Sequence, residues 1–166
     1  MAQRFTLDLL QISWNTLGAR YDYPRFWSAL LACGAPVGLT ISLDEIEVYD
    51  WDEQAIHLTP AASLALSQAP SRLFQRFGLP LGLDTRAFLV SLDGQPQYGG
   101  IFLHRISAMG IDFPVIYIEP DGDKVVLLVR PRHIIFGEHR GLPASVRAVV
   151  ERPAIRQALM EAGKLP

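Results

Sequence analysis

Two short groups of polar side chains in the second half of the sequence have the residue types that could do chemistry. The first group is His104, Arg105, Ser107 and Asp112, and the second is Arg130, Arg132 and His133. Arginine presents a planar fork that can bind a carboxylate or phosphate with two hydrogen bonds, and histidine exchanges a proton near neutral pH. Such a set suits the binding of an anion, or acid–base chemistry on a bound substrate.

Strands are the elements that would position these groups. Residues 86–92 and 95–107 have the composition of two strands on either side of Asp93-Gly94. This dipeptide is typical of a tight hairpin, because both central residues of a type I′ turn need a positive φ. Gly99-Gly100 inside the second strand indicates a bulge or the close approach of another backbone.

Two further runs, 112–119 and 124–130, also have the composition of strands. We therefore expect a four-strand antiparallel meander over about 86–130. In such a meander 104–112 and 130–133 lie at the same end of the sheet, so the two polar groups would converge there. They would form either an anion-binding site or an ordinary rim in which Asp112 pairs with the arginines. The rim is the more common arrangement of surface charges.

No motif indicates a metal, a cofactor or a catalytic nucleophile. The acidic turn at 50–53 lacks the glycine and the closing glutamate of a calcium loop, and His133 and His139 are too far apart for a zinc-protease helix. Gly-x-Ser-x-Gly and both glycine-rich phosphate loops are absent. Cys33 lies in an apolar run, where an inert thiol is expected. We predict no metal site and no cofactor.

The composition is that of one globular domain spanning 1–166. Of its 166 residues 49% are hydrophobic and 19% are charged, and the formal net charge is −2. A chain of this length buries roughly 70% of its unfolded surface without needing disulfides. The near-neutral charge and the absence of a basic and aromatic nucleic-acid motif predict that nucleic acid is not a partner.

The small net charge hides two opposite segments. Residues 44–53 hold six acids and no base, whereas residues 124–156 hold seven bases and two acids. Charged runs usually form solvated faces or pair within the fold. The functional alternative is that the basic segment receives an anionic small molecule or an acidic protein surface.

The remaining elements complete an α+β fold. We expect a strand at 4–9, a helix within 24–33 that begins at a proline, and a hairpin over about 45–59. Short helices are expected at 61–68 and 71–77. Two helical pieces that begin at Pro143 and Pro153 follow the meander. The predicted architecture is a mainly antiparallel sheet packed against N-terminal and C-terminal helices.

The sequence predicts a cytoplasmic location by default. Residues 26–43 are uncharged, but glycine, proline and hydroxyl residues interrupt them, so no transmembrane segment is expected. The alternatives are an exported chain or a chain that is lipid-anchored at Cys33, since small and apolar residues precede this cysteine.

These observations favour a non-enzymatic ligand-binding or protein-interaction domain. The alternative is a small hydrolase-like enzyme with a dispersed site around His104 and Arg105, because dispersed sites leave no local motif. Self-association of the chain through an exposed sheet edge is compatible with either function.

Overall fold

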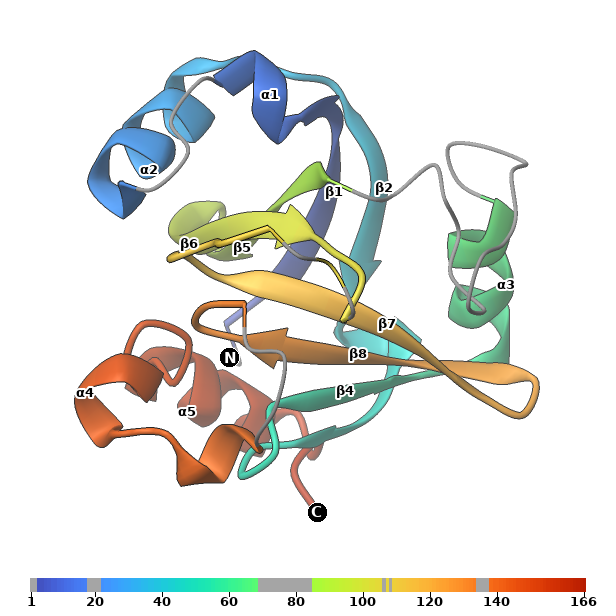
Figure 1. Ribbon diagram of the computed structural model, residues 1–166. Coiled ribbons are helices and arrows are strands. Elements are labelled where there is room, and N and C mark those ends of the chain that lie inside the picture. The colour runs from blue at the N-terminus through green and yellow to red at the C-terminus, as the bar shows by residue number, and fades with distance from the viewer. Residues whose placement is uncertain (1–2, 18–21, 69–84, 106, 108, 134–137) are drawn as a thin grey trace.

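The computed structural model describes residues 3–17, 22–68, 85–105, 107, 109–133 and 138–166. In this part of the chain eight strands form one sheet, in the order β2-β1-β5-β6-β7-β8-β4-β3 (Figure 1). Every neighbouring pair of strands is antiparallel except β6 and β7. The predicted α+β class with a mainly antiparallel sheet is therefore confirmed.

The elements have the following bounds. The strands are β1 (Phe5–Ser13), β2 (Val37–Ser42), β3 (Ile46–Asp50), β4 (Ala55–Leu58), β5 (Arg86–Leu92), β6 (Gln95–Phe102), β7 (Val115–Asp121) and β8 (Lys124–Arg130). The α-helices are α1 (Trp14–Leu17), α2 (Tyr23–Ala32), α3 (Pro60–Gln68), α4 (Ala144–Arg147) and α5 (Pro153–Glu161). The 3-10 turns within the described residues are η1 (Leu43–Glu45) and η3 (His139–Gly141).

The sheet is strongly curled. Its two edge strands, β2 and β3, follow one another in the chain and are separated only by η1. Such a link spans about 15 Å at most, whereas the edges of a flat sheet of this width would be about 34 Å apart. The sheet must therefore bend its edges toward each other, as the ribbon shows (Figure 1).

One apolar cluster lies on the inner side of this curl. All eight strands contribute to it, because every second side chain of a strand points to the same face. In Figure 1, α3 and α5 lie at opposite ends of β4 and β8, and both helices bury side chains in the same cluster. Members of the cluster include Phe5, Leu7, Ile41, Tyr49, Ile56, Leu66, Phe88, Tyr98, Phe102, Ile116, Leu127 and Leu159.

A second apolar cluster lies between α2 and the outer face of β5, β6 and β7. Phe26 of α2 stacks on Phe113, with ring centroids 4.2 Å apart, and Leu30 lies over β6. A Cβ atom at Gly99 would lie 2.4 Å from the Leu30 side chain, so the glycine allows α2 to pack directly on the strand. At the other end of α2, the Asp22 side chain accepts a hydrogen bond from the Arg25 N–H at 3.3 Å and so caps the helix.

One detail of the expected meander is wrong. The four strands β5, β6, β7 and β8 are neighbours in that order, but β6 and β7 pair in parallel, Ile101 with Val115 and Phe102 with Ile116. Residues 103–114 are long enough to return the chain to the end of β6 from which it left, whereas a hairpin needs only a short turn. The pairing of two distant segments, and not the local pattern, decides this orientation.

The other local predictions agree with the structure. Asp93 and Gly94 have φ values of 48° and 78°, as a type I′ turn requires. The hairpin expected over 45–59 is β3 and β4, the strand expected at 4–9 extends through Ser13, and α2, α3, α4 and α5 match predicted helices. The short helix expected at 71–77 lies outside the described residues.

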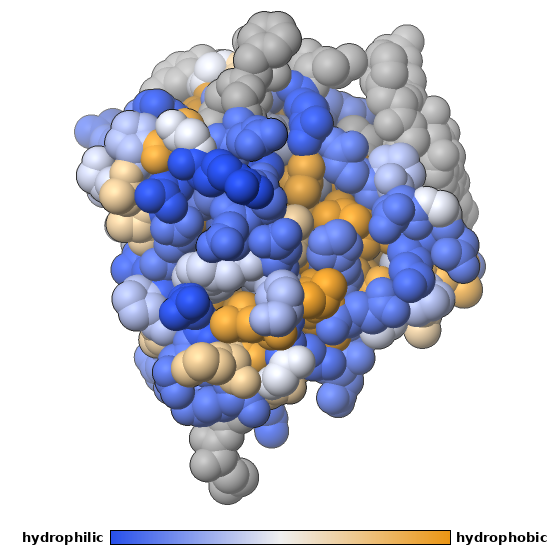
Figure 2. Space-filling model, turned by 90° about the horizontal axis from the view of Figure 1, so that it is seen from below, coloured by the Kyte–Doolittle hydropathy of each residue, from blue (hydrophilic) through white to orange (hydrophobic). Residues whose placement is uncertain are grey.

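One face of the molecule is mostly hydrophilic. Figure 2 shows hydrophilic residues around a central strip of apolar ones on the face seen from below. Among the described residues, the large hydrophobic side chains that are about half exposed lie on four different elements, and they are Leu31, Val37, Leu64 and Met160. In the same part of the chain, no helix has the length and apolar character needed to cross a bilayer.

Candidate functional site

The connection from β6 to β7 and the residues that follow β8 lie together, as the sequence predicted for the two polar groups. The backbone N–H of His133 donates to the Ile111 carbonyl at 3.0 Å. The Nε2 atom of His133 lies 2.6 Å from the Ser107 carbonyl oxygen. The parallel pairing of β6 and β7 still produces this convergence, because the end of β6 lies beside the start of β7.

His133 has both ring nitrogens engaged. A carbonyl oxygen can only accept, so Nε2 donates its proton to Ser107. Nδ1 shares a hydrogen bond with the Tyr117 hydroxyl, at 2.7 Å. Tyr117 is buried, with 2% of its surface exposed. The imidazole therefore ties the 103–114 connection to β7 and has no nitrogen left to act as a base on a substrate.

Arg105 pairs with a carboxylate on β7. Its Nε lies 3.3 Å from a carboxylate oxygen of Glu119, and its guanidinium lies 5.7 Å from the centroid of the Tyr117 ring. Both side chains of the ion pair are substantially exposed. The half-buried His104 follows directly after Leu103, and the Ser107 hydroxyl accepts from the Met109 N–H at 3.2 Å. The contacts of Arg105 and Ser107 hold the connection between β6 and β7 in place, since Arg105 pairs with β7 and Ser107 bonds within the connection.

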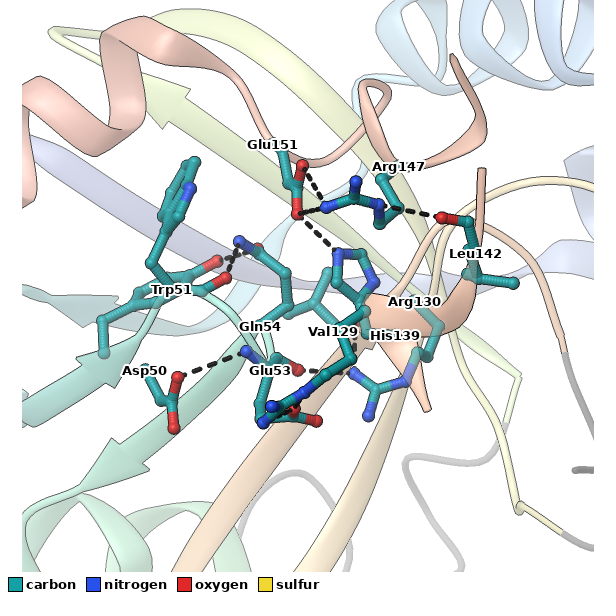
Figure 3. A network of polar contacts seen from close by, with 12 residues as sticks. Asp50, Trp51, Glu53, Gln54, Val129, Arg130, His139, Leu142, Arg147 and Glu151 are labelled. Atoms are coloured by element: carbon teal, nitrogen blue, oxygen red, sulfur yellow. Dashed lines mark hydrogen bonds and ion pairs between the residues drawn. The ribbon is translucent and has the colours of Figure 1, made fainter. Parts of the chain in front are cut away.

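Arg130 belongs to a different, buried polar cluster, which also includes Tyr49, the turn residues 51–54 and Val129. It is buried, and its Nη1 donates to the carbonyl oxygens of Glu53 at 2.9 Å and Val129 at 2.8 Å (Figure 3). Burial lowers the pKa of its guanidinium, partly opposed by the Glu53 carboxylate. Arg130 thus ties the end of β8 to the turn between β3 and β4.

Gln54 is the centre of this buried cluster, and sequence reasoning did not identify it. Its side chain is fully buried, with its Oε1 accepting from the Tyr49 hydroxyl at 2.7 Å and its Nε2 donating to the Trp51 carbonyl at 2.8 Å. Its φ of 51° lies in the left-handed region, which glutamine seldom adopts. Burial raises the pKa of Tyr49 well above its ordinary value. In the sequence, Gln54 reads as an ordinary hydrophilic turn residue.

A buried histidine and a glutamate adjoin this cluster. His139, in η3, is completely buried, and its Nε2 donates to an Oε1 of Glu151 at 2.9 Å. Arg147 donates to both oxygens of the same carboxylate, at 3.1 and 3.3 Å, and to the Leu142 carbonyl at 3.0 Å (Figure 3). Within the described part of the chain, Nδ1 of His139 is buried without a hydrogen-bond partner. Burial lowers the pKa of His139, with the Glu151 hydrogen bond acting against it.

The acidic and basic segments meet within the fold. Lys124 pairs with Glu47 at 3.0 Å, and Arg140 pairs with Glu53. In each case the carboxylate raises the pKa of the basic side chain. The ordinary interpretation of the charge asymmetry, pairing between the two segments, therefore accounts for these four residues.

Asp112 and Arg132 line a small pocket. Its volume is about 180 Å³, and its other lining residues are Tyr23, Phe113, Pro114, Pro131, Val146 and Val149. Both charged residues are exposed. Their side chains form no hydrogen bond or ion pair with each other or with other described residues. The expected pairing of Asp112 with the arginines is thus not seen among these residues.

Cys33 lies at the edge of a second, wider hollow. This hollow has a volume of about 540 Å³ and is lined mainly by residues 11–13 and 33–36. The half-buried thiol donates to the Leu30 carbonyl, with 3.1 Å between Sγ and the oxygen. The described residues contain no cluster of three or more potential metal ligands.

Comparisons with protein-family models, with curated proteins and with solved structures found no match. The candidate site therefore rests on the geometry of this chain.

Proposed function

We propose that the protein is a non-enzymatic binding domain whose pocket beside Asp112 and Arg132 holds a small organic molecule through its carboxylate group. One observation carries this proposal: two oppositely charged side chains line one apolar pocket and pair with nothing among the described residues. Arg132 would bind the carboxylate of the ligand through its guanidinium fork. The apolar lining would contact the body of the ligand.

The size of the pocket supports a small ligand. Pockets that enclose drug-sized molecules have volumes of about 300–1,000 Å³, and this one has about 180 Å³. The lining comes from segments far apart in the sequence, since Tyr23 begins α2, Phe113 precedes β7 and Val146 lies in α4. Such a pocket exists only in the folded chain.

The alternative function, hydrolysis around His104 and Arg105, has less support. General-base catalysis needs an imidazole nitrogen within reach of the substrate. Among the groups around this connection, His133 has both nitrogens engaged by Ser107 and Tyr117, and Arg105 pairs with Glu119.

Titration with 4-methylpentanoate, followed by amide NMR shifts, tests the binding proposal. We expect saturable shifts at Asp112, Phe113 and Arg132, with a dissociation constant of about 1 mM for so small a ligand. Arg132→Gln should weaken binding about tenfold to hundredfold, because it removes a charged hydrogen-bond donor. Arg156→Gln is the matched control, since Arg156 is exposed and lies outside the pocket lining.

Two outcomes would overturn this proposal. One is the absence of saturable shifts in the unmodified chain, and the other is equal affinity of the unmodified chain and the Arg132→Gln variant. Hydrolysis of nitrophenyl esters that is lost in His104→Ala would instead support the enzyme.

A further inference from the structure

The pocket is lined by one negatively charged and one positively charged side chain. Arg132 follows β8, and Asp112 lies on the connection between β6 and β7. From these paired charges we infer that the ligand is a zwitterion, namely a free α-amino acid with a short apolar side chain. This inference rests on the proposed function of the same pocket and names its ligand class.

Charge complementarity carries the argument. A simple carboxylate bound at Arg132 would leave its own negative charge near that of Asp112, and like charges that approach each other repel. An α-amino acid carries an ammonium group beside its carboxylate. The carboxylate can accept from the Arg132 guanidinium while the ammonium donates to the Asp112 carboxylate, so that both charged side chains gain a partner.

The remaining lining specifies the side chain of the ligand. Phe113 is almost completely buried behind the pocket, and Pro114, Pro131, Val146 and Val149 add apolar surface without charge. Tyr23 adds a hydroxyl, which accepts a hydrogen bond from the Gly99 N–H at 3.5 Å, but no further charge. A charged side chain would lose its hydration there without an opposite charge to pair with. At about 180 Å³ the pocket suits one amino acid of leucine size.

Three matched compounds test the inference. They are L-leucine, 4-methylpentanoate, which lacks the amino group, and 3-methylbutylamine, which lacks the carboxylate. Each is titrated by NMR against the unmodified chain, Asp112→Asn and Arg132→Gln, with Arg156→Gln as the control. We expect L-leucine to bind at least about tenfold more tightly than either analogue. Asp112→Asn should remove the advantage of leucine over 4-methylpentanoate, and Arg132→Gln should remove its advantage over 3-methylbutylamine.

The outcomes separate this inference from the proposed function. If 4-methylpentanoate binds as tightly as leucine, and Asp112→Asn changes neither affinity, the inference of a zwitterionic ligand is wrong, whereas the proposed carboxylate-binding pocket stands. If none of the three compounds binds, or if Arg132→Gln leaves every affinity unchanged, the pocket itself is wrong. Leucine binding that Arg156→Gln weakens as much as Arg132→Gln would also contradict the assignment.

Discussion

At the scale of single residues, two histidines show how surroundings decide what an imidazole does. His133 donates to a carbonyl through Nε2 and shares a hydrogen bond with the Tyr117 hydroxyl through Nδ1, so both ring nitrogens are engaged. His139 has a carboxylate partner on one nitrogen and none on the other among the described residues. A proton on that second nitrogen would be buried and unsolvated, with Arg130 and Arg147 nearby.

The first prediction concerns His139 and pH. Because burial holds its folded pKa below the ordinary value of about 6.5, the unfolded chain takes up the proton first as pH falls. The free energy of unfolding should therefore decrease below about pH 7, by at most about 1.4 kcal/mol per pH unit, until the folded pKa is reached. Urea denaturation over this range measures it.

His139→Gln is the variant that isolates this effect. Its amide can still donate to Glu151 but takes up no proton in this range. The pH dependence of its unfolding should be shallower than that of the unmodified chain. Parallel curves for the two proteins would show that another group is responsible.

At the scale of elements, the contact between β6 and β7 is the critical joint of the sheet. It joins β2, β1, β5 and β6 to β7, β8, β4 and β3 through two register pairs. Backbone bonds from Ile101 N–H to the Pro114 carbonyl at 3.2 Å, and from Leu103 N–H to the Ile116 carbonyl at 3.0 Å, complete it. A Cβ atom at Gly100 would lie 1.8 Å from the Pro114 oxygen, so only glycine fits.

The second prediction follows from this clash. Gly100→Ala should lower the free energy of unfolding by at least about 3 kcal/mol, because the obstacle is backbone and cannot move without opening the joint. Gly110→Ala is the control, since its added Cβ would meet nothing within 4 Å, and it should cost less than about 0.5 kcal/mol. Equal midpoints in urea for the two variants would contradict this account of the joint.

At the scale of the whole molecule, residues near the C-terminus lie against one edge of the sheet. The N–H of Tyr49, on the edge strand β3, donates to the Lys164 carbonyl at 2.8 Å, and Leu165 packs against the inner apolar cluster. The chain end thus occupies part of one edge. An unpaired strand edge is a template for pairing with a second chain.

The third prediction is that removing residues 164–166 promotes self-association through β3. The truncated chain should lose about 1–3 kcal/mol of stability. In sedimentation velocity at equal concentration, it should contain more dimer than the intact chain. Leu165→Ala loses the packing but keeps the Lys164 carbonyl, so it should not gain dimer. If Leu165→Ala also forms more dimer than the intact chain, the self-association follows from lost packing and not from the uncovered edge of β3.

The sequence by itself determined the elements whose causes are local. Asp93-Gly94 required a hairpin because of its positive φ values, and alternation placed β3 and β4 around an acidic turn. These features depend on neighbours along the chain, which the sequence shows directly.

Only the tertiary structure decided the rest. The parallel pairing of β6 with β7, the burial of Gln54, and the common pocket of Asp112 and Arg132 each depend on segments far apart in the chain. The sequence names each charged residue but does not show whether its charge is paired in the fold. Which charges pair with each other, and which do not, follows from distances that exist only after the sheet has formed and curled.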